Sequence, residues 1–558
     1  MKQQKAYGNE SISSLKGADR VRLRPAVIFG SDGLEGCEHA VFEILSNAID
    51  EAREGYGRQI LVTRYEDHSI EVEDFGRGCP VDWNEKEGKY NWELASGCVR
   101  NVLAETKIDP AEIAAISTTC MREGILLYDK DGNEIWACAN VDARSNDEVA
   151  ELIRMNPDLE LELYKKSGQS YALNAIPRIL WVKNNMPDIY EKTAKIGMFN
   201  DWLIYKLTGV LAVEPSNGST TGLLDLQTRT WDTEIAAKCN LRTDIFPDIL
   251  ECGSISGKVT AKGASETGLA EGTPVVVGGG DCQLGTIGVG ACKPGEAAVF
   301  GGSFWQYEFN TESGKTDPYG RVRVNCHAVP GVWQYEALAF KPGLVMRWFR
   351  DGFCQEEKRK AKEIGDDPYN LMNQAAEKIP AGCYGMMCCF SDIMNFINWK
   401  HAAPTFTNFE LLPEKFNKYT FYRSILENTA MLVKGHIELV KEATGNKPDK
   451  LIFAGGASVS DLWSQILADV TGKPVVTPVV KEATALGAAI IAGYGVGIYP
   501  SIAEGAAICA KVDKTYTPNL ENKKVYDEMY PVWREVYKAN LNLCDRKLTK
   551  NMWIAPGL

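Results

Sequence analysis

Three short apolar runs that each end in neighbouring glycines constrain the fold of this 558-residue chain most strongly. A strand that ends in glycines can bring backbone amides close to a phosphate, and a helix that follows adds a favourable dipole. One such turn is more often structural than functional, but three in succession predict an α/β nucleotide-binding fold. The first turn runs into Asp281, which would aim a carboxylate at the reacting atom. The turns are Gly278-Gly-Gly280, Gly301-Gly302-Ser303 and Gly455-Gly456-Ala457.

The composition narrows the function further. Hydrophobic residues make up 45% of the chain, which is enough to build a sizeable core. There are 61 basic and 74 acidic side chains, so the net charge of −13 argues against a generic nucleic-acid or membrane partner. No apolar run is long enough to span a bilayer. Sixteen cysteines without C-x-x-C pairs, and only five histidines, predict reduced, buried thiols in a cytoplasmic protein without a zinc site.

A second polar motif, Met121-Arg-Glu-Gly124, lies upstream of the first glycine turn. We predict a strand over 111–120 before this motif and a hairpin over 125–137 after it, because Asp131-Gly132 separates two apolar runs. Arg122 can donate hydrogen bonds and Glu123 can accept them. Both are therefore candidate substrate ligands, although an exposed ion pair would show the same pattern.

Together these features resemble the FGGY carbohydrate kinases, which have an actin-like (ribonuclease H-like) α/β fold of two domains. The resemblance covers residues 95–558 and implies a substrate-side domain at 95–265 and a nucleotide-side domain at 266–558. Further matching motifs are Ile135-Trp-Ala-Cys-Ala-Asn-Val-Asp-Ala-Arg144, Glu214-Pro-Ser-Asn217, Thr220-Thr-Gly-Leu-Leu-Asp225, Leu462-Trp-Ser-Gln-Ile-Leu-Ala-Asp469 and Lys481-Glu-Ala-Thr-Ala-Leu-Gly487.

The resemblance implies transfer of the terminal phosphoryl group of ATP to a primary hydroxyl of a small sugar-like diketone. Asp281 would be the general base that takes the hydroxyl proton, which suits a carboxylate because the loose transition state needs the proton removed late. The alternative for Asp281 is a residue that only caps a turn. Arg122 and Glu123 would hold substrate oxygens, with Asp142 as a neighbour in the same pocket. A homodimer is compatible with the family.

On the nucleotide side, the resemblance implies that Gly301, Gly302 and Ser303 cradle phosphate. Gly455, Gly456 and Ala457 would line the adenine, and Mg²⁺ would bridge the phosphates. Gly314-Lys315-Thr316 looks like the end of a P-loop, but Phe309 occupies the position that requires the upstream glycine, so the motif is excluded.

Residues 1–94 read differently from the rest of the chain. A helix over 36–54 and strands over 59–65 and 69–73 are predicted. Glu43 and Asn47 share one polar helix face, and Asp74 opens an Asp-Phe-Gly-Arg-Gly turn. The pair of motifs resembles the truncated start of a GHKL ATPase, as in type II topoisomerase (gyrase) B subunits. It implies roles as water-activating base, magnesium ligand and adenine ligand for Glu43, Asn47 and Asp74.

The kinase resemblance also has a gap. The family opens with a strand that carries Asp-x-Gly-Thr/Ser and binds phosphate and magnesium, and residues 1–120 contain no such motif. We therefore expect a fusion whose first kinase domain lacks its opening strands, leaves a strand edge unpaired and transfers phosphate poorly. Two alternatives stay open at this point, an ATP-binding topoisomerase fragment without DNA chemistry and a non-catalytic ligand-binding fusion.

Overall fold

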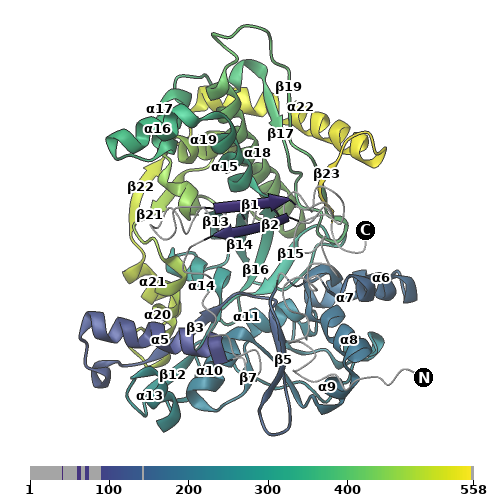
Figure 1. Cartoon of the computed structure of the whole chain (residues 1–558), viewed down its shortest axis with the longest axis vertical. Helices are drawn as coiled ribbons and strands as arrows, with labels where there is room; N and C mark the ends of the chain where they lie inside the picture. The colour runs from purple at the N-terminus through teal and green to yellow at the C-terminus, as the bar shows by residue number, and fades with distance from the viewer. Residues whose placement is uncertain are drawn as a thin grey trace.

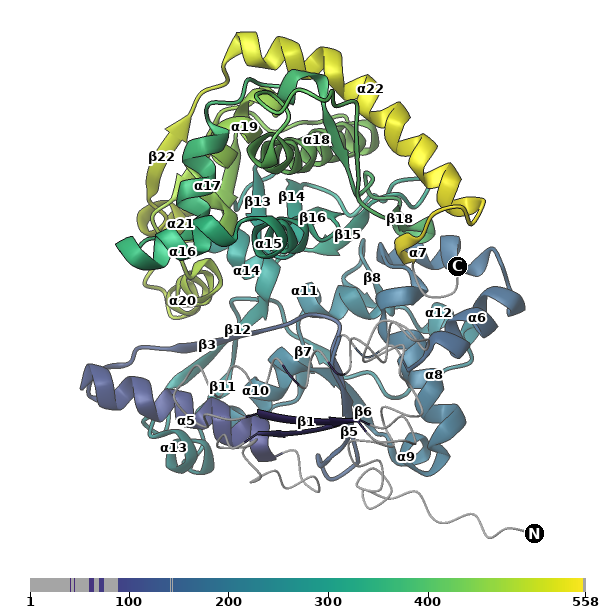
Figure 2. The ribbon, with the colours of Figure 1, turned by 45° about the horizontal axis from the view of Figure 1, so that its top comes forward.

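The structure is a computed structural model, and the chain forms two stacked lobes (Figure 2). The upper lobe of that view holds a seven-stranded sheet, and the lower lobe holds two three-stranded sheets. This two-lobed α/β arrangement agrees with the fold predicted from the sequence. The residues that the structure describes are Val41, Leu45, 60–64, 70–74, 89–140, 142 and 144–554.

The upper sheet has the strand order β15-β16-β14-β13-β20-β21-β22. Its middle strands β13, β20 and β21 are parallel, and they read as short apolar runs because both faces of this part of the sheet are covered. Two of the three predicted glycine turns follow β13 and β20. The strands are β13 (Ala297–Gly301), β14 (Trp305–Thr311), β15 (Arg323–Cys326), β16 (Trp333–Ala339), β20 (Leu451–Ala454), β21 (Val475–Pro478) and β22 (Val512–Tyr516).

Helices and short strands enclose this sheet (Figure 1). The long helix α18 packs on β14 and β16 and against α19, and its buried face joins the largest apolar core of the molecule. The helices are α15 (Pro342–Phe353), α16 (Gln355–Ile364), α17 (Pro368–Ala376), α18 (Lys418–Thr444), α19 (Asp461–Thr471), α21 (Ile502–Cys509) and α22 (Leu520–Asp545). The short strands are β17 (Met387–Cys389), β18 (Lys400–Ala402), β19 (Thr405–Thr407) and β23 (Asn551–Ile554).

The lower lobe is built from the sheets β11-β12-β3 and β5-β4-β6. The predicted hairpin is confirmed, since β4 and β5 pair in antiparallel fashion around Asp131-Gly132. The strand predicted from residue 111 begins only at Ile116, because Pro110–Glu112 form a 3₁₀ turn that the Asp109 side chain caps. The strands are β3 (Ile116–Cys120), β4 (Ile125–Tyr128), β5 (Glu134–Cys138), β6 (Lys195–Met198), β11 (Ile255–Lys258) and β12 (Pro274–Gly280).

The remaining elements of the lower lobe cover these sheets. The helices are α5 (Lys89–Thr106), α6 (Asn146–Met155), α7 (Leu159–Ser167), α8 (Ala175–Asn185), α9 (Pro187–Lys192), α10 (Phe199–Thr208), α11 (Pro215–Gly218), α12 (Thr233–Lys238) and α13 (Ala261–Thr267). Two-residue strands form small ladders: β7 (Ala212–Val213) with β10 (Asp248–Ile249), and β8 (Leu224–Asp225) with β9 (Thr230–Trp231).

The prediction that Gly278-Gly-Gly280 forms a phosphate turn is wrong. All three glycines lie inside β12, are buried, and pair in part with β3. A Cβ on Gly278 would lie 1.7 Å from the carbonyl oxygen of Thr118, so the glycine is needed for close strand packing. The helix that follows, α14 (Asp281–Gly288), starts directly at Asp281.

Glycines also bring α14 against α20 (Ala483–Gly495). A Cβ on Gly487 would lie 1.9 Å from the carbonyl oxygen of Leu284, and one on Gly288 would lie 1.8 Å from that of Ala483. The two helix backbones are therefore in direct contact. Helix α20 also packs on β3 and β12, so it holds α14 against the lower sheet.

The start of the chain is described only in part. β1 (Ile60–Arg64) and β2 (Ile70–Asp74) pair with each other in a separate antiparallel ladder, close to the predicted strands. Within the described part of the chain, β3 has one strand neighbour, β12. Glu43 and Asn47 lie outside the described residues, whereas the backbone of Asp74 ends β2.

Two further features bear on the predictions from composition. Within the described residues, no helix combines the length and the apolar character that crossing a membrane requires. The cysteines of the same part of the chain are free thiols, and most of them are buried, as predicted.

Candidate active site

Asp281 is the first residue of α14 and follows the buried strand β12. Its Oδ1 accepts a hydrogen bond of 2.8 Å from the backbone amide of Cys282 and lies 3.6 Å from Nε of Arg122. The side chain is 49% exposed, so the carboxylate is open to a substrate. Desolvation raises the pKa of Asp281 and the positive charge of Arg122 opposes this shift. The group is thus an accessible carboxylate with enhanced basicity, which is what a general base requires.

Arg122 is buried rather than exposed, which excludes the surface ion pair that was the alternative. Its guanidinium forms an ion pair with Glu336 on β16 through Nη1, and its Nε lies 3.6 Å from Asp281. Burial opposes ionisation of Glu336, but Arg122 and Arg323 outweigh it and lower the pKa of this carboxyl. Arg122 is therefore fixed as a charged donor beside Asp281.

Glu123 belongs to the same network. It forms an ion pair with Arg323 on β15, and Arg323 also contacts Glu336. Arg178 donates to the carbonyl oxygen of Glu123. The φ of Glu123 is +71°, a left-handed conformation that is uncommon outside glycine. Such strain persists where surrounding contacts fix it, and here those contacts hold Glu123 within the network around Arg122.

Sequence reasoning missed Glu336, a charged residue inside the largely apolar strand β16, and Arg323, the first residue of the fully buried strand β15. That mismatch is the signal that could have identified them. Asp142, by contrast, accepts hydrogen bonds from its own neighbour Arg144, whose guanidinium also lies over Trp181. The structure therefore places Asp142 in a local pair and shows no contact between it and Arg122 or Asp281.

A buried cluster of Cys282, Glu308 and Glu336 lies directly behind the base. Their potential metal-ligating atoms are within 4.8 Å of one another. However, the Cys282 thiol donates a 2.9 Å hydrogen bond to Glu308, and burial raises the pKa of both groups. Arg122 already engages Glu336 and the thiol already donates to Glu308, so the cluster is a hydrogen-bonded network, and these contacts point to no metal ion.

Five of the six predicted nucleotide residues line one cavity of about 480 Å³ in the upper lobe. Gly301, Gly302, Ser303, Gly456 and Ala457 lie on its wall. Gly455 does not line it. This glycine has φ +87°, and a Cβ there would lie 2.8 Å from the carbonyl oxygen of Gly301, so it makes the turn behind the wall.

The chemistry of this cavity fits ATP. Backbone turns at Gly302 and Gly456 leave space for close approach, since a Cβ on Gly456 would meet no atom within 4 Å. Tyr369, Tyr422 and Trp463 supply apolar wall for a base, and Arg347 and Arg350 supply positive charge. The sequence analysis assigned none of these five side chains to the nucleotide site. Trp463 lies in one of the motifs that match the family, whereas no local pattern separates the other four from core or surface residues.

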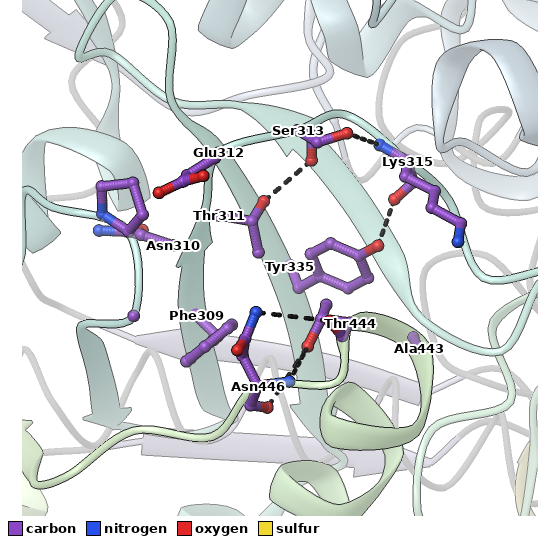
Figure 3. Close-up of a pocket in the computed structure, with 12 residues that line it drawn as sticks. Phe309, Asn310, Thr311, Glu312, Ser313, Lys315, Tyr335, Ala443, Thr444 and Asn446 are labelled. Carbon is purple, nitrogen blue, oxygen red and sulfur yellow. Dashed lines mark hydrogen bonds between the residues drawn. The ribbon is translucent and has the colours of Figure 1, made fainter.

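A second cavity of about 510 Å³ lies between β14, the loop after it and the end of α18 (Figure 3). Its polar groups bind one another: Thr311 donates to the carbonyl oxygen of Ser313, and the amide of Asn446 donates to Thr444. Lys315 lines it and is followed by no helix, in agreement with the exclusion of a P-loop here. These satisfied contacts identify no ligand.

The two lobes, the exposed carboxylate beside a fixed arginine and the glycine-lined cavity together define a phosphotransferase of the actin-like sugar kinase class. The chain belongs to the FGGY family of carbohydrate kinases. The N-terminal domain model of that family matches residues 62–288, and the C-terminal domain model matches residues 310–496.

Two relatives and two solved structures illustrate the match. The chain is 46% identical to the autoinducer-2 kinase of Salmonella typhimurium, over 90% of this chain and 94% of that protein. It is 48% identical to the autoinducer-2 kinase of Yersinia enterocolitica, over 84% of this chain and 89% of that protein. The fold is similar to xylulose kinase from Rhodospirillum rubrum, with a TM-score of 0.71, 23% identity and coverage of 84% of this chain and 93% of the other. Plasmodium falciparum glycerol kinase with ADP has the same TM-score and coverages at 20% identity.

These findings establish a carbohydrate kinase that transfers phosphate to an alcohol group. They lend no support to the expected loss of activity or to the two non-kinase alternatives. The family match begins at residue 62, inside β1 and within the segment 1–94 that resembles a GHKL ATPase. The GHKL origin and the missing opening strands therefore remain predictions.

Proposed function

We propose that the chain phosphorylates autoinducer-2 in its open diketone form, dihydroxypentanedione, with ATP as the donor. The observation that carries this proposal is the position of Asp281, half-exposed at the start of α14 and 3.6 Å from Arg122. The choice of substrate is supported by the names and the 46% and 48% identity of the two relatives.

In the proposed reaction, Asp281 accepts the proton of the primary hydroxyl as the oxygen–phosphorus bond forms and the bond to ADP breaks. Arg122 donates to a substrate oxygen and Glu123 accepts from a hydroxyl. Both are held by Glu336 and Arg323, so little reorganisation is needed when the substrate binds. Asp142 is a weaker candidate for the same pocket, because Arg144 engages its carboxylate.

The proposed nucleotide site is the cavity lined by Gly302, Ser303 and Gly456. Mg²⁺ would neutralise the phosphate charge there, and it prefers carboxylate and phosphate oxygens. The phosphate oxygens would supply the ligands for this ion, and Asp281 does not line the cavity. Within the described residues Oδ2 of Asp281 accepts no hydrogen bond, so this oxygen is free to take the hydroxyl proton. A cytoplasmic location is proposed as well, in keeping with the free thiols.

The test is release of ADP by the purified, monodisperse chain with Mg-ATP, in the presence and absence of dihydroxypentanedione. We expect release that depends on the diketone. The Asp281→Asn variant should lose this activity by several orders of magnitude while it still binds ATP. Asp527→Asn, an exposed aspartate on α22, is the matched control and should behave as the wild type. Binding of ATP without turnover in the wild type would contradict the proposal.

For residues 1–94 we infer a GHKL-like origin, supported by the paired motifs around Glu43, Asn47 and Asp74, although residues 62–94 also fall within the kinase family match. This inference predicts a second ATP site that is independent of the kinase site. The inference is supported if a variant without the kinase cavity still binds nucleotide and if this remaining binding is lost on Asn47→Ala. A single ATP-binding event that is unaffected by Asn47→Ala would refute it.

A further inference from the structure

Lys341 joins β16 to α15 in a strained conformation. Its φ and ψ are +59° and +27°, in the left-handed region that a residue with a Cβ adopts at some cost. The next residue, Pro342, is the first residue of α15. Proline has no backbone N–H, and the first residue of a helix needs none. A glycine would adopt this left-handed conformation without strain. The presence of a long cationic side chain at this position therefore calls for a function of that side chain.

The lysine lies beside the proposed phosphate turn. A Cβ on Gly343, two residues later, would lie 2.2 Å from the carbonyl oxygen of Gly302 and 3.1 Å from Cα of Ser303. One residue before Lys341, the ring of Phe340 packs at 5.2 Å against Phe304, which follows Ser303. Contacts on both sides of Lys341 thus reach the turn at 302–304, so the backbone of Lys341 lies next to this turn, although its side chain packs on Phe340 and does not line the cavity.

The positive charge of the Lys341 ammonium group also has no anionic partner in the described part of the chain. Nζ lies 5.0 Å from the ring centroid of Phe340, and in the described part of the chain no carboxylate lies within ion-pairing distance of it. The side chain is half-buried, and burial lowers the pKa of the amine. A partly desolvated cation without an anionic partner, next to a glycine turn, is stabilised by an incoming anion.

We propose that Lys341 binds a phosphate group of the nucleotide and positions it at the Gly302-Ser303 turn. This inference rests on the proposed function, because it assigns the nucleotide phosphates to that turn. In the first kinase domain the sequence lacks the phosphate-binding motif with which this family opens. Lys341 supplies positive charge to the phosphates from the second domain, and the strain at its backbone is the cost of placing that charge.

Binding measurements on the full chain test this assignment, with calorimetric titration of ATP, ADP and adenosine. Lys341→Met should weaken ATP and ADP binding by about tenfold or more, the range of one charge-assisted contact. Adenosine binding should stay within about twofold of the wild type, because the base site is unchanged. Lys341→Arg should restore most of the ATP affinity. Lys315→Met, which removes a lysine from the other cavity, is the matched control and should change none of the three.

A second variant separates a phosphate ligand from a structural residue. Lys341→Gly relieves the left-handed strain, so its thermal midpoint should equal or exceed that of the wild type while its ATP affinity falls as in Lys341→Met. A structural lysine would instead show a lower midpoint with unchanged affinity. Wild-type ATP affinity in Lys341→Met, or an equal loss for adenosine, would overturn the inference.

The outcomes also distinguish this inference from the proposed function. If the wild type binds ATP but does not phosphorylate the diketone, the proposed function fails, and the difference between ATP and adenosine still decides the role of Lys341. If the wild type turns over and Lys341→Met binds and turns over equally well, only the inference about Lys341 fails.

Discussion

Acidification should destabilise the upper lobe through three buried histidines. His327, His401 and His436 are fully buried, and in each a ring nitrogen accepts a hydrogen bond from a backbone amide. Protonation would place an N–H against that amide and put a charge in the core. Burial accordingly lowers the pKa of each histidine to about 3, with smaller contributions from nearby positive charges.

The sign and size of the effect follow from linkage. The folded state keeps the three rings neutral, whereas the unfolded chain takes up protons below its ordinary histidine pKa of about 6.5. Stability is therefore independent of these groups above about pH 7 and falls as the pH drops from about 6.5 towards 3. Near pH 4.5, two units below the unfolded pKa, each histidine costs about 3 kcal/mol. The three together cost about 8 kcal/mol, which is comparable to the stability of a whole domain.

Urea unfolding followed by tryptophan fluorescence between about pH 4.5 and 7 measures this loss directly. The matched variants are His327→Asn, His401→Asn and His436→Gln, since each places an amide oxygen where the ring nitrogen accepts its hydrogen bond. Each variant should take up about one proton fewer on unfolding, so its free energy of unfolding depends less steeply on pH. An unchanged pH dependence in all three variants would refute the reasoning.

Three further predictions concern the site and its support. Gly487→Ala should lower the free energy of unfolding by about 1–3 kcal/mol, as shown by urea denaturation, because the new methyl group meets the backbone of Leu284. Glu336→Gln should cost about 3–5 kcal/mol by the same assay, because it removes the buried anion that pairs with Arg122 and leaves only the half-exposed Asp281 near it. Arg122→Met should move the acid limb of kcat/KM to higher pH, since the positive charge that lowers the pKa of Asp281 is removed. A limb that stays in place would show that another group titrates.

Local patterns predicted the parts of this site that lie within one turn or one hairpin. The turns at Gly301 and Gly455, the hairpin at Asp131-Gly132 and the position of the proposed base, Asp281, after a buried strand are each indicated by adjacent residues. The partners of Arg122 and Glu123 could not be predicted in the same way. Glu336 and Arg323 are 214 and 200 residues distant along the chain. The pairing of β15 with β16 places them side by side, and the contact between the two lobes brings them to Arg122 and Glu123.

The glycines of β12 show that a local pattern can also predict the wrong conformation. Gly278-Gly-Gly280 has the composition of a phosphate turn, yet the same three residues also permit one strand to lie unusually close to another. The sequence alone does not show whether a ligand or the backbone of a neighbouring strand approaches a glycine. Here the neighbouring strand is β3, and it decides the conformation.

The contact between α14 and α20 ties the base to both halves of the molecule. Asp281 begins α14 directly after a strand of the lower sheet, and its carbonyl oxygen accepts a hydrogen bond from Thr484 at the start of α20. Helix α20 follows β21 of the upper sheet along the chain, and it packs on β3 and β12 below. The helix pair therefore connects the two lobes. A rotation of one lobe relative to the other about this helix pair would change the distance between the cavity at Gly302 and Asp281, and with it the distance over which a phosphoryl group would pass.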